Sequence, residues 1–162
     1  MAETLVYNIP AKLIDAYRGR NLIVRSASPR EIVEALAHTD LARVRFIQLL
    51  SMPADTGDLE AWGQGIPIDI VLRDPAAEFA SLNNYAKLRH THPIRVTVPV
   101  VPGCSKAVKL AVSLDFAVKL ETNQPDGFLI EELLEILDLY LHRANVRQPI
   151  EFFHTVLQSY YQ

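Results

Sequence analysis

Five short runs rich in β-branched residues recur along the chain at nearly constant spacing, and this rhythm constrains the fold more than any other feature. The starts of successive runs lie 22, 24, 26 and 23 residues apart. A β-hairpin needs only a few connecting residues, whereas the crossover between two parallel strands needs a dozen or more, usually in a helix. The spacing therefore predicts strand–helix units around a parallel sheet. The predicted strands are Leu22–Arg25, Val44–Leu50, Ile68–Leu72, Ile94–Val101 and Ala117–Leu120.

Helix start signals lie in the segments between these runs. Ser28 is followed by Pro29 and, three residues after the serine, by Glu31, so these residues can cap the first free amides and preset the backbone of a helix. Asp74 and Pro75 repeat this start, and we expect Ser28 and Asp74 to act as N-caps. The predicted helices are Arg30–His38, one from Pro75 through Ala86, one after Cys104 with a buried stripe from Ala107 to Leu114, Gly127–Arg143, and one from Gln148.

The longest predicted helix, Gly127–Arg143, has an apolar stripe and an acidic opposite face, as a helix that packs on a core does. Its stripe consists of Ile130, Leu133, Leu134, Leu137, Tyr140 and Leu141.

Three further segments are assigned from their residue patterns. Near the N-terminus, the sequence predicts a further strand at Leu5–Ile9 and a short helix at Ala11–Tyr17. Residues 52–67 read as a loop with one short helix. Proline is tolerated at the end or the edge of a strand, so Pro99 is expected there.

These elements predict an α/β fold of repeated βα units with a mainly parallel sheet. Five or six units are fewer than the eight of a closed barrel. The sheet is therefore expected to be open, or to form a half-to-three-quarter barrel. Either form has exposed edge strands, which natural proteins cover or pair. No sharp linker interrupts residues 1–162, so we expect a single α/β domain.

Composition and charge exclude several classes of function. The net charge is −3, with acidic and basic residues interspersed, whereas nucleic-acid binding normally requires a basic surplus. No run approaches the roughly 18 apolar residues of a membrane span, and residues 1–4 lack the basic start of a secretion signal. A single cysteine, Cys104, excludes an internal disulfide. We expect a cytoplasmic protein without a nucleic-acid or membrane partner.

The second half of the chain resembles the later strands of the partial barrel in radical S-adenosylmethionine proteins that modify peptides. The resemblance covers residues 94–162. Its basis is the run PIRVTVPVVPGCSKAVKLAVSLDFAVKLETNQPD and the closing RANVRQPIEFFHTVL. The family holds an iron–sulfur cluster with a three-cysteine motif, and this chain has Cys104 alone. The resemblance therefore implies a partial barrel in an accessory relative rather than in an active radical enzyme.

Ligands of α/β proteins bind beyond the carboxyl ends of the strands, and this rule selects the candidate ligand-binding residues. The turn at Gly103–Lys106 is the most suggestive, because glycine allows close backbone approach, the following amides open a helix, and Lys106 adds positive charge. A phosphate or a carboxylate could bind there. The candidates are Arg73, Gly103, Cys104, Ser105, Lys106, Glu121 and Asn123.

The sequence gives little support for catalysis or for metal binding. Cys104 could be a nucleophile, but no histidine is placed beside it, and Glu121 alone identifies no reaction. His90 and His92 lack a third ligand for a metal, so both are expected to be solvated loop residues. We expect neither a metal nor a cofactor.

Two hypotheses follow from this pattern. The first is a non-catalytic accessory or binding module, in a peptide-modification system, that acts through self-association or a partner protein. The alternative is a small enzyme or binding protein for an anionic ligand at the carboxyl rim of the strands.

Overall fold

The computed structural model describes residues 5–121 and 134–139. Six strands alternate with helices along the chain. The strands are β1 (Val6–Pro10), β2 (Asn21–Ser26), β3 (Val44–Leu49), β4 (Ile68–Val71), β5 (Ile94–Pro99) and β6 (Ala117–Glu121). The α-helices are α1 (Pro29–Leu36), α2 (Gly57–Trp62), α3 (Pro75–Glu78) and α4 (Cys104–Ser113), and the 3₁₀-helices are η1 (Ala11–Tyr17), η2 (Leu41–Arg43) and η3 (Phe79–His90).

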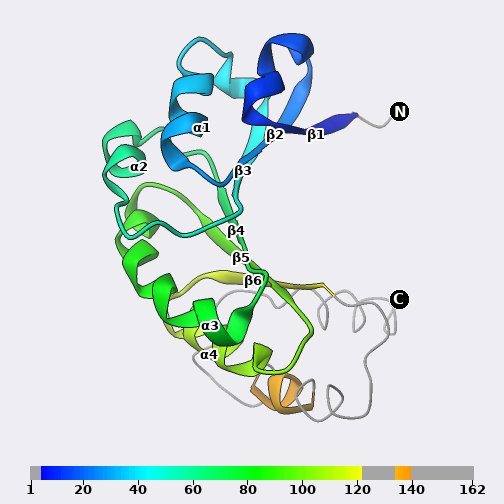
Figure 1. The fold of residues 1–162 in the computed structure, drawn as a ribbon, viewed down its shortest axis with the longest axis vertical. Coiled ribbons are helices and arrows are strands. Elements are labelled where there is room, and N and C mark those ends of the chain that lie inside the picture. Colours follow the sequence, from blue (N-terminus) through cyan, green and yellow to red (C-terminus); the bar gives the residue numbers. More distant parts are fainter. Residues whose placement is uncertain (1–4, 122–133, 140–162) are drawn as a thin grey trace. The chain divides into compact units, whose positions relative to one another are not determined.

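The strands form one open, all-parallel sheet in the order β1-β2-β3-β4-β5-β6 (Figure 1). Each strand therefore pairs with the next strand along the chain, and the sheet does not close into a barrel. This confirms the α/β fold and the βα repeats that the spacing predicts. All six strands begin and end within two residues of their predicted bounds, and Pro99 is the last residue of β5.

The chain divides into two compact units. Unit 1 comprises residues 1–71 and 87–94, and unit 2 comprises residues 72–86 and 95–162. Unit 1 contains β1 to β4, and in it Leu22 pairs with Val44 whereas Ile23 pairs with Phe46. This register shift is a β-bulge, because one residue of β3, Arg45, has no partner on β2. Unit 2 contains the ladder of β5 and β6.

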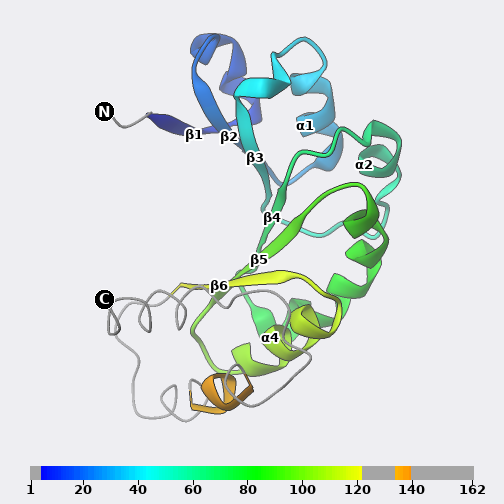
Figure 2. The ribbon, with the colours of Figure 1, turned by 180° about the vertical axis from the view of Figure 1, so that it is seen from behind.

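In unit 1, α1 and α2 lie on one side of the strands (Figures 1 and 2). Strand residues alternate between the two faces of a sheet, so one face of β2 to β4 supplies the core. The core residues on this face include Val24, Ile47 and Ile70, which are fully buried. The helix residues Ile32 and Leu59 are also fully buried and belong to the same core. The Ser28 hydroxyl accepts a hydrogen bond of 3.3 Å from the Glu31 amide, which confirms the predicted N-cap of α1.

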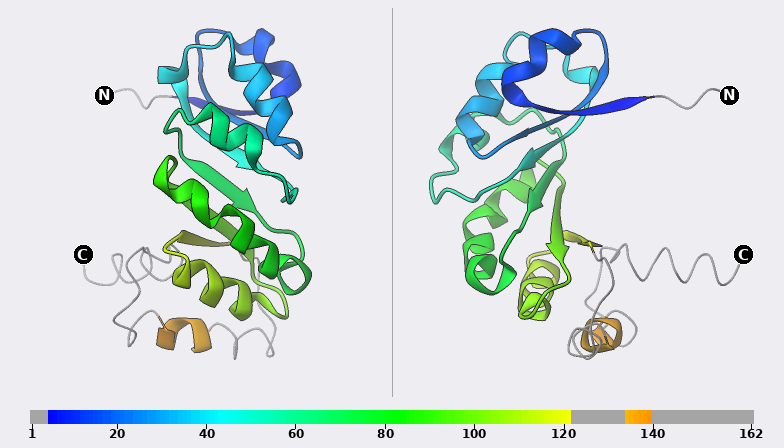
Figure 3. Two further views of the ribbon diagram at one scale, coloured as in Figure 1. Left: turned by 90° about the vertical axis from the view of Figure 1, so that its left-hand side faces the viewer. Right: turned by 45° about the vertical axis from the view of Figure 1, so that its right-hand side comes forward.

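In unit 2, α3 and α4 lie side by side (Figure 3). The inner stripe of α4 includes Ala107, Val108 and Ala111, all fully buried. The helix predicted from Pro75 through Ala86 is confirmed, although only its first part, α3, is α-helical and the chain continues as the 3₁₀-helix η3. Polar side chains compete with the helix there: the Asn83 amide donates to the Ala80 carbonyl at 3.1 Å. No described helix is long and apolar enough to cross a membrane.

The helix predicted over residues 127–143 is described only at residues 134–139. There Ile136 and Leu139 are buried, whereas Leu134 is 60% exposed. The predicted stripe is therefore wrong at Leu134. The buried residues of this segment, Ile136 and Leu139, are not members of the predicted stripe. Lys109 of α4 pairs with Glu135 at 3.1 Å. The rest of this helix, the last predicted helix and Asn123 lie outside the described residues.

Tyr85 in unit 2 provides a pH-dependent probe of the core. Its side chain is fully buried, and desolvation raises its pKa from 10.0 to about 12. The neutral phenol is therefore favoured in the folded state. Its contribution to stability is present in full below pH 10 and is lost as the pH rises towards 12.

We expect the wild-type protein to lose more stability than Tyr85→Phe between these pH values, by about 2–3 kcal/mol. Urea unfolding of both proteins across the alkaline range measures the difference. Parallel losses in the two proteins would contradict the assignment to Tyr85.

Candidate functional site

The predicted rim residue Arg73 lies two residues after the end of β4 and is exposed. The backbone amides of Arg73 and Asp74 both donate to Glu78 Oε1, at 2.8 and 2.6 Å. A carboxylate of α3 thus satisfies these amides in place of an external anion. Asp74 occupies the predicted N-cap position of α3, with Pro75 directly after it, but its side chain makes no capping hydrogen bond within the described residues. The Glu78 carboxylate instead bonds the amide of the N-cap residue itself.

The turn at Gly103 opens α4, as predicted. Gly103 has a φ of +88°, and a Cβ atom at this position would lie 2.7 Å from the Cβ of Ala76 in α3. Only glycine combines this backbone angle with so close a contact. Cys104 and Ser105 are buried, whereas Lys106 is exposed on the first turn of the helix. Of the candidates in this turn, the structure therefore leaves Lys106 accessible to a solute.

Cys104 is the one cysteine of the chain, and its side chain is buried. Nucleophilic cysteines are partly exposed, so the structure does not favour that role. An iron–sulfur cluster requires several thiolate ligands, and the residues present do not fit one.

Glu121 ends β6 beside Pro99, and the Val100 amide donates to its carbonyl at 2.8 Å. Val118 and Leu120 are buried on the face that α4 covers. Side chains alternate along a strand, so Glu121 lies with Lys119 on the opposite face. The structure therefore places Glu121 and Lys106 on different sides of β6.

A polar row in unit 1, which the sequence did not predict, crosses four strands on the face opposite α1 and α2. Arg25 Nη1 donates to Asn8 Oδ1 at 2.8 Å, and Asn8 Nδ2 donates to Gln48 Oε1 at 2.9 Å. Gln48 Nε2 then donates to Asp69 Oδ2 at 3.0 Å. Arg25 pairs with Gln48 and Gln48 with Asp69 in the strand register. The row thus joins a guanidinium to a carboxylate through two amides, each oriented by its neighbours.

The polar row affects both the stability of the fold and the register of its strands, because Asp69 is buried. Asp69 is only 2% exposed, and a buried carboxylate is tolerated only when hydrogen bonds compensate for lost hydration. Fixed donors and acceptors across four strands also define their register, because a shift by one residue would break every link. Arg25, Gln48 and Asp69 occupy matched positions of successive strands, whereas Asn8 pairs with Ile23 in the register. The sequence signal therefore becomes visible only once the register is known.

His92 departs from the expected solvated loop histidine, whereas His90 is exposed as predicted. His92 is fully buried, and its ring stacks on Trp62 at 5.5 Å between centroids. Nδ1 lies 2.8 Å from the Ile66 carbonyl oxygen. A carbonyl only accepts, so Nδ1 carries the proton. Nε2 is then a buried acceptor without a partner in the described residues.

Exposed apolar side chains occur just before β1, within β1 and on the helix that follows it. Leu5 is 70% exposed, Val6 is 40% exposed and Leu13 of η1 is 46% exposed. Within residues 5–121 and 134–139, β1 has a strand neighbour, β2, on one side only. This combination gives unit 1 an apolar edge with unpaired backbone groups.

Neither a metal site nor a known relative indicates the function. In the described ranges, no three histidine, cysteine or acidic side chains come together in the arrangement of a metal site. Comparison of the chain with protein-family models, curated proteins and solved structures finds no match.

Proposed function

We propose that this chain is a non-catalytic binding module that self-associates through the edge strand β1. The supporting observation is the exposure of Leu5 and Val6 beside an edge that has no strand neighbour among the described residues. An exposed apolar edge strand is a template for pairing with another chain. Pairing satisfies its free backbone groups and removes apolar surface from water.

The two edges of the sheet differ in charge, which favours β1 as the pairing edge. Residues 5–10 carry no charged side chain, whereas β6 carries Lys119 and Glu121. Charged side chains are a common protection of edge strands against pairing. The edge at β1 lacks this protection in the described part of the chain.

The uncharged sequence of β1 favours pairing with β1 of a second copy of this chain. A two-fold axis places the same strand on both sides of the interface and runs the two copies antiparallel. Like charges that face each other across strands destabilise such a pair. Because residues 5–10 are uncharged, a self-paired β1 has no such repulsion.

The resemblance to radical S-adenosylmethionine proteins that modify peptides supports an accessory role in such a system. In this proposal the dimer presents its remaining surface to a peptide-modifying enzyme or its substrate. The rival proposal is an anion-binding protein or small enzyme at the carboxyl rim, and the exposed Lys106 and Arg73 favour it. Calorimetric titration of a Lys106 variant with small anions separates the two.

Val6→Lys is expected to convert the dimer to a monomer, because a lysine on an edge strand opposes pairing. Light scattering coupled to size-exclusion chromatography, over a range of protein concentrations, measures the mass. The matched control is Leu134→Lys, which adds the same charge at an exposed leucine of unit 2 and should leave the dimer intact. A wild-type chain that stays monomeric at high concentration would exclude self-association.

A further inference from the structure

Unit 1 contains a pocket of about 190 Å³ at the amino-terminal ends of β2 and β3, away from the carboxyl rim. Its lining includes three arginines and a histidine, which are Arg18, Arg20, Arg43 and His38. We propose that this pocket binds a small organic polyanion, a phosphate ester or a polycarboxylate. The inference is independent of self-association through β1.

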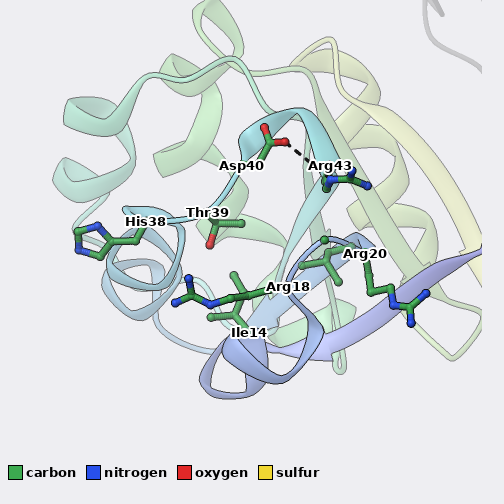
Figure 4. Close-up of a pocket in the computed structure, with 9 residues that line it drawn as sticks. Ile14, Arg18, Arg20, His38, Thr39, Asp40 and Arg43 are labelled. Carbon is green, nitrogen blue, oxygen red and sulfur yellow. Dashed lines mark ion pairs between the residues drawn. The ribbon is translucent and has the colours of Figure 1, made fainter.

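Local backbone structure positions the cationic side chains. Arg18 and Arg20 flank Gly19, which has a φ of +78° and open space where a Cβ atom would lie. The turn closes with a hydrogen bond of 3.2 Å from the Arg20 amide to the Tyr17 carbonyl. Figure 4 shows that Arg20 and Arg43 extend on one side of the pocket and Arg18 and His38 on the other. Arginine side chains therefore flank the pocket on two sides.

The acidic side chains near the pocket leave part of this positive charge uncompensated. Asp15 accepts two hydrogen bonds from Arg18, at 2.7 and 3.2 Å. Asp40 accepts from the Ala42 amide at 3.1 Å, and its other oxygen lies 3.8 Å from Arg43 Nε, beyond hydrogen-bond range. The Arg20 guanidinium has no ion pair or hydrogen bond within the described residues. Arg20 is thus the free guanidinium of the lining in the described ranges, and Arg43, held by an ion pair of 3.8 Å with Asp40, is the second anion ligand in this proposal.

The wider charge distribution agrees with an anionic ligand. Residues 12–45 contain seven lysines and arginines and four acidic residues, in a chain whose net charge is −3. A local basic surplus on an acidic protein raises the local concentration of anions. Guanidinium groups also match the geometry of phosphate and carboxylate oxygens.

The apolar part of the lining indicates an organic ligand rather than a bare ion. Ile14 and Leu22, both buried, contribute to the wall of the pocket. A binding site typically combines apolar walls with a few placed polar groups. The volume of about 190 Å³ restricts the ligand to a small molecule.

Isothermal titration calorimetry of the full chain tests this proposal. Citrate represents polycarboxylates, inorganic phosphate represents the phosphoryl group, and chloride at equal ionic strength is the reference. We expect saturable binding of at least one probe, and the stronger probe identifies the chemical class. Arg20→Gln with Arg43→Gln should weaken it about tenfold or more, as the loss of charged hydrogen bonds does.

Two control variants isolate the pocket. Arg30→Gln removes an exposed arginine of α1 that pairs with Glu34, and it should leave the affinity within about twofold. Lys106→Ala should do the same, whereas a rim site requires it to abolish binding. If the double variant is unfolded by circular dichroism, Arg20→Gln alone is the test. No saturable binding, or equal affinity in the arginine variants, would overturn the proposal.

Discussion

Gly103→Ala is expected to lower the free energy of unfolding by about 3 kcal/mol, because strain and overpacking combine at this position. The new Cβ would lie 2.7 Å from Ala76 Cβ, on a backbone with a φ of +88°. Neither atom is the end of a flexible side chain, so α3 and α4 must move apart. Urea denaturation of the variant and the wild type measures the loss.

Gly19→Ala is the matched control for backbone strain. Gly19 also has a positive φ, +78°, but nothing lies within 4 Å of the position of its Cβ. We therefore expect a loss of only about 1 kcal/mol there. In addition, Ala76→Gly in the Gly103→Ala background should restore part of the stability, because it removes the contacting atom. Equal losses at the two glycines would contradict the close packing of α3 against Gly103.

Asp69→Ala is expected to cost about 3 kcal/mol, since it removes a buried carboxylate and leaves Gln48 Nε2 without its acceptor. The comparison is Glu34→Ala, which removes an exposed carboxylate that pairs with Arg30 and should cost less than about 0.5 kcal/mol. Urea unfolding of both variants gives the two values.

A double-mutant cycle between Asp69→Ala and Gln48→Ala tests whether the polar row acts as a unit. Their hydrogen bond predicts a coupling of about 0.5–3 kcal/mol. Additive losses, or an Asp69 variant as stable as the Glu34 variant, would show that the row contributes nothing beyond independent contacts.

The strands could be predicted from the sequence because their signal is local. A run such as Ile68–Leu72 is bounded by turn residues, and the crossover length fixes the parallel direction. The N-cap at Ser28 could be predicted for the same reason, because Ser28 and the residue that donates to it, Glu31, are close in sequence. The 3₁₀ geometry of η3 and the exposure of Leu134 could not be predicted, because the spacing of apolar residues specifies neither the type of a helix nor what covers each of its faces.

The functional features depend on contacts between distant segments, and these the sequence could not reveal. The polar row requires the register of four strands, and the stacking of His92 on Trp62 joins residues far apart in the chain. The arginine pocket likewise combines the turn at Gly19 with the end of α1. Conversely, the rim rule selected Cys104 and Ser105 from their position after a strand, although both are buried.

Deuterium uptake of β1 at two protein concentrations tests the proposed self-association most directly. Pairing of β1 with its own copy predicts slower exchange of the amides from Val6 to Ile9 at the higher concentration. This dependence should vanish in Val6→Lys and persist in Leu134→Lys. Exchange of β1 that is equal at both concentrations in the wild-type protein, or concentration-dependent protection confined to another segment, would contradict β1 as the interface.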